Sequence, residues 1–220
     1  YTGEDTLSLH DALPIWVLIL FTFIIQAISY EFQNKAGNLF GVRTFQTGLI
    51  INGILGPLLL GGAVATFFTG SNFIVEKGNI TDFMQPVISH WANGSRGLDV
   101  LLNPWVVIFG ISVVFLARIL GTLYINNNVN DDIIRGRVRK QLLVNTVLFL
   151  LFFLPFLIVT LVGEGYAVNE AGVIVMEPMK YLNNLLAMWP LAIILLVGVV
   201  LLLFGIVKTV LKPEYVRGIW

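Results

Sequence analysis

Long apolar runs separated by shorter polar segments form the main pattern of this chain. Five runs approach the ~20 residues that a helix needs to cross a hydrocarbon core of about 30 Å, and they cover residues 15–29, 47–69, 102–125, 142–162 and 184–210. A membrane β-barrel would instead show ~10-residue segments that alternate apolar and polar residues. The pattern therefore predicts an all-α fold, a polytopic transmembrane helix bundle with five spans in this sequence.

Proline and asparagine residues mark the start or the interior of several runs. Asn103 directly precedes Pro104 at the start of the third run, an order typical of a helix N-cap followed by proline at the first helical position. Pro57 and Pro155 lie inside the second and fourth runs, where neighbouring helices can satisfy the carbonyl groups that proline leaves without a donor. We therefore expect these two prolines to be packing features rather than gates.

Basic residues are distributed unevenly between the segments that follow the runs. Nine Lys and Arg residues follow the first, third and fifth runs or close the fifth, whereas three follow the second and fourth. Because short basic loops stay on the cytoplasmic side of a membrane, we expect the longer segments 70–101 and 163–183 to face outward.

The composition supports a membrane protein and excludes several other classes. Hydrophobic residues make up 57% of the chain and charged residues 12%, and the formal net charge is zero. A protein without a basic surplus is poorly suited to a phosphate backbone, so we expect no nucleic-acid partner. Cysteine is absent, which excludes disulfides and thiolate ligands for haem or iron–sulfur clusters from these 220 residues.

The few polar residues inside the runs are candidates for an intramembrane role. Arg118 is the one unambiguous charge within a run; it either anchors to a carboxylate on a partner helix or to a lipid phosphate, or it snorkels toward the headgroups. The neutral polar residues are expected to form hydrogen bonds between helices, and they are Gln26, Asn52, Asn145 and Thr146.

Catalytic and metal-binding groups are missing from the same runs. No Asp or Glu lies at the middle of a run, although a proton-coupled carrier normally needs one. The two histidines, His10 and His90, lie outside the runs, so these residues offer no histidine ligation of haem across spans. We therefore predict no catalytic, cofactor-binding or metal-binding residues in this chain.

The second run is rich in glycine, with glycines at 48, 53, 56, 61 and 62. Small residues let helix backbones approach closely, which favours a helix that lies deep in a bundle or at a subunit contact. A broken helix that lines a substrate site is the alternative. On the residues alone, a small secondary transporter and a structural membrane scaffold therefore both remain open.

Four stretches carry a more specific signal, and they are "IIQAISYEFQNKAG", "ILGPLLLGGAVATFFTG", "GLDVLLNPWVVIFGISVVFLARILGTLYINN" and "YLNNLLAMWPLAIILLVG". In this order and spacing they resemble subunit II of cytochrome bd ubiquinol oxidase, in a version similar to Bacteroidetes sequences. The most specific marks are "LLNPW" before a long helix and the aromatic–acid–aromatic "YEF" after the first run. The resemblance extends over residues 17–220.

The resemblance implies a role in aerobic respiration within a quinol:dioxygen oxidoreductase. In that family haem b, haem d and the quinol site belong to subunit I, and subunit II is a haem-free bundle that supports its partner and contributes to a proton route. It therefore implies no cofactor in this chain, oxidase subunit I as partner, and a multi-pass location in the bacterial inner (plasma) membrane. A lipid or a quinone bound to the bundle is also expected.

The chain departs from the family pattern in two places. The family's opening helices, with their acidic "FDLG"-like and "HWDGN"-like motifs, have no counterpart here, so we expect an internal fragment of the subunit. The family often has arginines around "YEF", whereas this chain has Gln26 and Gln33 around Glu31. Glu31 is therefore either a functional acid of the family or an ordinary solvated loop acid.

The polar leader "YTGEDTLSLHDALPI" precedes the first run and has no place in the family pattern. Acidic residues stand where a signal peptide needs positive charge, and no cleavage site follows an apolar region. The stretch "TLSLHDALPI" resembles the translation of a sequencing adapter. We therefore expect residues 1–15 to be a non-native leader and residues 16–220 to be a partial membrane domain. Arg118, Gln26, Glu31 and Asn103 remain as the polar candidates for intramembrane or interface roles.

Overall fold

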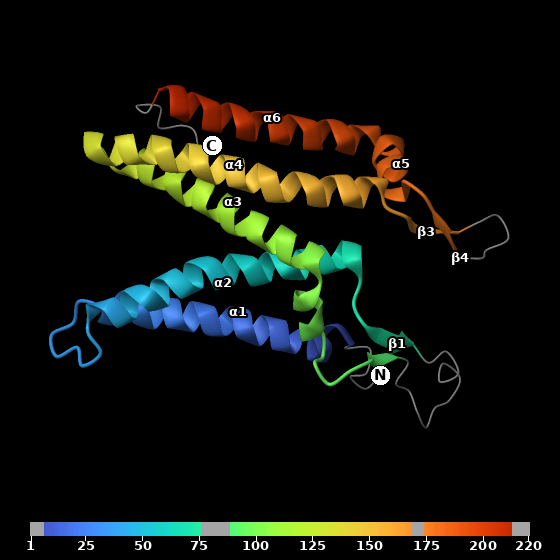
Figure 1. The fold of residues 1–220 in the computed structure, drawn as a ribbon, viewed down its shortest axis with the longest axis horizontal. Coiled ribbons are helices and arrows are strands. Elements are labelled where there is room, and N and C mark those ends of the chain that lie inside the picture. The colour runs from blue at the N-terminus through green and yellow to red at the C-terminus, as the bar shows by residue number, and fades with distance from the viewer. Residues whose placement is uncertain (1–6, 76–88, 169–173, 213–220) are drawn as a thin grey trace. The chain divides into compact units, whose positions relative to one another are not determined.

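The computed structural model describes residues 7–75, 89–168 and 174–212, and Figure 1 shows these segments as a helical ribbon. The chain divides into two compact units, residues 1–114 and residues 115–220, and the boundary along the chain falls within the helix Pro104–Asn128. Five helices of the described segments are long and apolar enough to cross a membrane: Ile15–Phe32, Val42–Thr69, Pro104–Asn128, Asp132–Val162 and Trp189–Leu211. The predicted all-α bundle with five spans is confirmed.

The first unit is built on a pair of helices, α1 (Leu7–Phe32) and α2 (Val42–Thr69), which lie side by side in Figure 1. A two-stranded antiparallel sheet follows, in which β1 (Phe73–Val75) pairs with β2 (Ser89–Trp91). The 3-10 helix η2 (Leu98–Leu102) then leads into the first part of helix α3 (Pro104–Asn128).

Within this unit α2 and α3 approach each other closely because both carry glycine at the crossing. A methyl group added at Gly61 would lie 2.9 Å from the Cα of Gly110 and 2.9 Å from the side chain of Val113. A side chain at either glycine would therefore push the two helices apart. The glycine-rich α2 is continuous from Val42 to Thr69 and includes Pro57, as the packing interpretation predicts.

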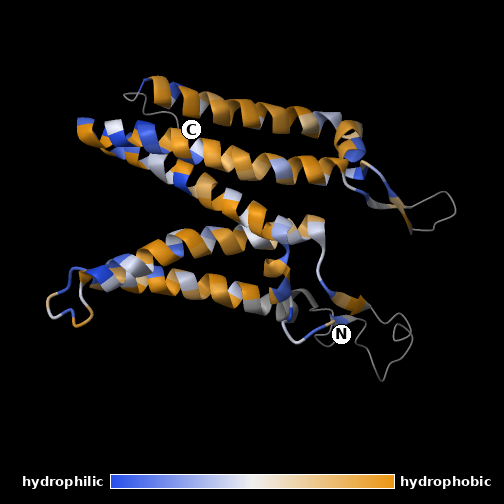
Figure 2. Ribbon diagram, viewed as in Figure 1, coloured by the Kyte–Doolittle hydropathy of each residue, from blue (hydrophilic) through white to orange (hydrophobic). Residues whose placement is uncertain are grey.

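The second unit contains the rest of α3, helix α4 (Asp132–Val162) and helix α6 (Trp189–Leu211). A second antiparallel pair, β3 (Gly165–Val168) with β4 (Ile174–Glu177), and the short helix α5 (Lys180–Ala187) connect α4 to α6. Its core is a cluster of buried apolar side chains from α3, α4 and α6: Ile119, Leu123, Leu142, Phe149, Ile206 and Val210. Figure 2 shows that the long helices are mainly hydrophobic and that polar residues gather toward helix ends and connections.

The ends of the helices differ from the apolar runs in three places. Helix α4 begins ten residues before its apolar run because Asp131 caps it, accepting a hydrogen bond from the backbone N–H of Ile134 at 2.9 Å. The fifth run is not one helix; it breaks at Met188, since Pro190 occupies the first turn of α6 and cannot continue α5. Helix α1 begins at Leu7, inside the predicted leader, while its membrane-compatible part begins at Ile15.

Candidate functional site

The first polar contact inside the bundle joins α1 to α2. The Asn52 side-chain N–H donates to the side-chain oxygen of Gln26 at 2.7 Å, so both residues form the hydrogen bond between helices that the sequence predicts. Asn52 is buried, with 8% of its surface exposed, whereas Gln26 is exposed in this chain. Small neighbours make room for the amides: a methyl group at Gly56 would lie 3.4 Å from Asn52 Oδ1.

The α1–α2 interface is polar over about two helical turns. Thr22 and Ser29 on α1 are almost fully buried against α2, and the Thr22 hydroxyl donates to the carbonyl of Ile19 at 2.7 Å. The Oδ1 atom of Asn52 is buried and accepts no hydrogen bond from any residue that the structure describes. This interface can therefore accept one more hydrogen bond, from a water or a hydroxyl group.

The second polar contact joins α3 to α4 in the second unit. Arg118 Nε donates to Asn145 Oδ1 at 3.1 Å, and Asn145 is buried with 2% of its surface exposed. Arg118 itself is exposed, and no other hydrogen bond or ion pair holds its guanidinium among the described residues. Thr146, by contrast, donates to the carbonyl of Leu142 in its own helix at 2.7 Å, so the prediction of an interhelical bond was wrong for this residue. The i−4 carbonyl is within reach of a threonine hydroxyl in any helix, and no partner on another helix is needed.

Glu31 lies in the last turn of α1 and pairs with Lys35 at 2.9 Å. Both side chains are more than half exposed, and the Lys35 ammonium also lies 4.5 Å from the centre of the Phe32 ring. An exposed pair of this kind contributes only ~0.3–0.5 kcal/mol. The geometry is that of a surface ion pair at a helix end.

Asn103 lies between η2 and α3, where it terminates one helix and caps the next. Its side-chain oxygen accepts a hydrogen bond from the backbone N–H of Trp105 at 3.0 Å, directly before Pro104 at the first helical position. The predicted cap is therefore present. Its role is to fix the start of α3 rather than to take part in chemistry. The four candidates do not form one cluster: Gln26 and Arg118 each bond to a different asparagine, and Glu31 and Asn103 lie at helix ends.

A further polar cluster was missed from the sequence and lies in the connection between α2 and α3. Asp99 accepts hydrogen bonds from Asn72 at 2.6 Å, from Asn93 at 3.1 Å and from Ser95 at 2.8 Å. These three bonds, with the one from Asn72 the largest cause, lower the pKa of the Asp99 carboxyl from its ordinary value. The spacing of Asn93, Ser95 and Asp99 is visible as a turn pattern, but Asn72 is 27 residues away from Asp99 and no local signal connects them.

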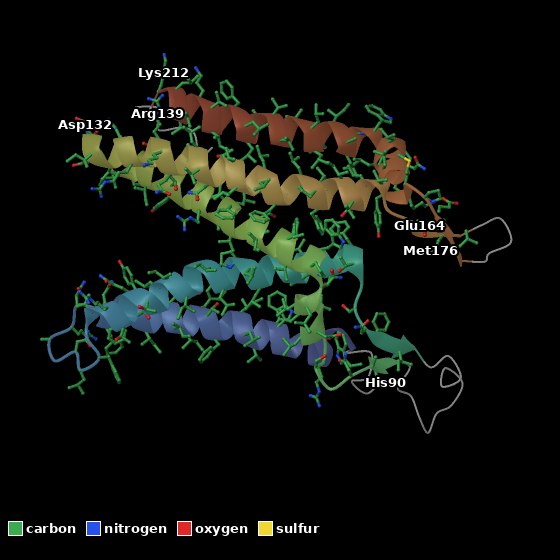
Figure 3. All side chains as sticks on the ribbon, viewed as in Figure 1. His90, Asp132, Arg139, Glu164, Met176 and Lys212 are labelled. Carbon is green, nitrogen blue, oxygen red and sulfur yellow. The ribbon has the colours of Figure 1, made fainter. Side chains whose placement is uncertain are left out.

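The described residues contain no group of three His, Cys, Asp or Glu side chains that could hold a metal ion. His90 is exposed on β2 opposite Ile74, outside the five long helices, as Figure 3 shows with its label. His10 lies in α1 before Ile15, where the membrane-compatible part begins. The five membrane-compatible segments contain no His, Met or Cys, the side chains that bind haem iron in globins, cytochromes c and P450 enzymes.

Comparison with protein families decides between the functions that the residues leave open. Residues 6–217 match the model of a family described as cytochrome bd terminal oxidase subunit II. The chain belongs to the cytochrome bd terminal oxidase subunit II family. The resemblance on the four quoted stretches is thereby confirmed. No curated protein was found to match the chain.

Membership of the subunit II family gives the polar contacts their setting. With five membrane-compatible helices, this family member is a multi-pass membrane protein of a respiratory oxidase. Asp132, Arg139 and Lys212 lie at one end of α4 and α6 in Figure 3, and Glu164 and Met176 lie beyond the other end. The Arg118–Asn145 contact thus lies within membrane-compatible helices between these ends, and the Gln26–Asn52 contact lies within the membrane-compatible parts of α1 and α2.

Proposed function

We propose that this chain is the haem-free membrane subunit of a quinol:dioxygen oxidoreductase in the bacterial inner membrane, where it supports a haem-bearing subunit I. The family match over residues 6–217 carries the proposal. The distribution of ligands supports it, because the membrane-compatible helices offer no His, Met or Cys to a haem iron. The proposal assigns the axial ligands to subunit I.

The role of this chain in such a complex is to hold and orient its partner. Its helices are stabilised by close packing at Gly61 and Gly110 and by the apolar core around Leu142 and Phe149. Large parts of the outer helix surfaces remain exposed and apolar, most of all on α6. Such surfaces fit lipid tails and other membrane helices, which agrees with a supporting subunit.

The proposal is tested by purifying the full-length protein with and without the haem-bearing subunit. Without the partner it should show no haem absorbance, and with the partner the complex should show haem bands and oxidise quinol with consumption of dioxygen. The matched control is the partner purified without this chain, which should lose stability or activity. A haem spectrum from this polypeptide alone would refute the proposal.

The transporter alternative was suggested by the glycine-rich second run and by the prolines inside two spans. Helix α2 runs unbroken from Val42 to Thr69 with Pro57 inside it, and its glycines at 61 and 62 pack against neighbouring residues, which favours the packing interpretation. Saturable uptake of a substrate by reconstituted protein without its partner would restore the alternative.

A further inference from the structure

Arg118 has a buried anchor and an exposed charged end. Its Nε is bonded to Asn145 Oδ1 at 3.1 Å, and this bond holds the side chain against α4. The guanidinium carries further N–H donors, yet no other described residue accepts from them. An arginine that is exposed inside a membrane-compatible helix needs a further acceptor, which the described residues do not supply.

The depth of Arg118 argues against a lipid phosphate as that acceptor. Arg118 lies ten residues before Asn128 and fourteen after Pro104, which is about 15 and 21 Å along α3 at 1.5 Å per residue. On α4, Asn145 lies five residues beyond Lys140, or about 8 Å deeper than the last cation before the apolar run. Side chains lean toward the N-terminus of a helix, so Arg118 leaves α3 away from the nearer helix end.

No acidic residue in the described segments balances the charge of Arg118. In the five membrane-compatible helices the acidic residues are Glu31 and Asp132, and both lie at helix ends. The ion pairs in the described segments are Lys35–Glu31 and Lys180–Glu177, neither of which involves α3. A second copy of this sequence has the same distribution of acids and offers no carboxylate at the depth of Asn145.

Small and exposed residues lie beside Arg118 on α3. One turn further along α3, a methyl group added at Gly121 would meet nothing within 4 Å, and Tyr124 beside it is 60% exposed. Ala117 and Gly121 form a pair of small residues at the spacing that lets membrane helices approach closely. We define Ala117, Arg118, Gly121 and Tyr124 as the Arg118 face.

We propose that the Arg118 face docks a transmembrane helix of the partner oxidase subunit, and that this helix carries an Asp or Glu at the depth of Asn145. The carboxylate accepts hydrogen bonds from the free end of the guanidinium, while Asn145 holds the other side of the same group. Gly121 supplies the close approach that brings the two backbones together. This inference rests on the proposed function, because it requires the partner subunit.

The first experiment measures retention of the partner subunit by the full-length protein in detergent. Arg118→Gln should lower the affinity for the partner by about tenfold or more, and Arg118→Lys should restore most of it because it keeps the charge. The matched control is Arg137→Gln, which makes the same chemical change at an exposed arginine of α4 before its apolar run. It should leave retention unchanged.

The second experiment does not depend on how the Arg118 variants fold. The sequence contains no cysteine, so Tyr124→Cys introduces a single thiol on the Arg118 face, at a position that is 60% exposed, and leaves Gly121 unchanged. A thiol-linked photocrosslinker at this residue should label a peptide of the partner that contains Asp or Glu within an apolar stretch. The complex with the cysteine-free chain is the labelling control.

Several results would overturn the inference. Unchanged retention in Arg118→Gln, or crosslinks from residue 124 that reach only lipid, another part of the full-length chain or a second copy of it, would contradict it. The inference would also be contradicted if native mass spectrometry showed that Arg118→Gln loses co-purified anionic lipid while the partner stays bound. The wild-type protein separates the two proposals. If it retains no haem-bearing partner, the proposed function fails and the docking face fails with it. If the wild-type protein and Arg118→Gln retain the partner equally well, only the docking face is refuted.

Discussion

Substituting alanine at Gly110 tests the close crossing of α2 and α3. The added methyl group would lie 2.8 Å from the backbone oxygen of Leu58 and 3.0 Å from its Cδ1 atom. The side chain of Leu58 can change rotamer, but its carbonyl group is fixed by the backbone of α2. The methyl group can therefore be accommodated only if the two helices move apart and lose contacts along the crossing.

The expected magnitude comes from two opposing effects. Overpacking a well-packed contact costs ~1–3 kcal/mol, while replacing glycine by alanine in a helix returns ~1 kcal/mol. Gly110→Ala should therefore lower the free energy of unfolding by up to ~2 kcal/mol. Gly53→Ala is the matched control, because a methyl group there meets nothing within 4 Å and only the helix-propensity gain remains. The two variants should differ by ~1–3 kcal/mol.

The assay is unfolding of the purified protein in mixed micelles, with the folded fraction followed by circular dichroism against the mole fraction of denaturing detergent. Both variants are measured beside the wild-type protein under identical conditions. Equal stabilities for Gly110→Ala and Gly53→Ala would refute the reasoning. They would show that the crossing relaxes without cost and that glycine is not required there.

Three further predictions concern polar residues. Asn103→Ala should lower the free energy of unfolding by ~0.5–2 kcal/mol, measured in the same micelle assay, because α3 loses its N-cap. Asn103→Asp should retain most of the wild-type stability, and an equal loss of stability in both variants would contradict the capping role. Gln26→Leu should destabilise the protein by ~0.6–2 kcal/mol, and Asn52→Leu added to it should restore part of the loss in a double-mutant cycle; strictly additive losses would show that the two amides do not interact. The pKa of Asp99 is lowered from 3.8, so its stabilisation of the α2–α3 connection should be present above pH 3.8 and lost as pH falls through the folded-state pKa. Hydrogen exchange of this segment should therefore accelerate at acidic pH in the wild-type protein, while Asp99→Asn should lack that step; identical pH profiles would disprove the role of the carboxyl group.

The helices were predictable from the sequence because lipid forces each span to satisfy its own backbone. A long apolar run then reports a helix almost directly, as for residues 104–128. The cap at Asn103 was also predictable, since it depends on adjacent residues. The break at Met188 was not predictable: Pro57 and Pro155 stay inside helices while Pro190 lies in the first turn of one, and composition does not distinguish these outcomes.

The pairing of polar side chains depends on tertiary structure and was beyond the sequence. Gln26 and Asn52 are 26 residues apart, and Arg118 and Asn145 are 27 apart. The sequence indicates that each has to find a partner, because an unpaired polar group in lipid is costly. Which partner it finds is decided by the rotation of each helix about its axis, and no single-helix pattern determines that rotation.

The hydrogen bond between Gln26 and Asn52 also bears on how the protein is made. As the chain leaves the ribosome, α1 reaches the membrane before α2, and its amide group would enter lipid without a partner. Once α2 follows, the Asn52 amide can pair with Gln26 and lower the cost of transferring both groups from water. The unit that enters the bilayer most readily is thus the α1–α2 pair rather than either helix, and a delay between them would lengthen the time that Gln26 spends at the insertion machinery.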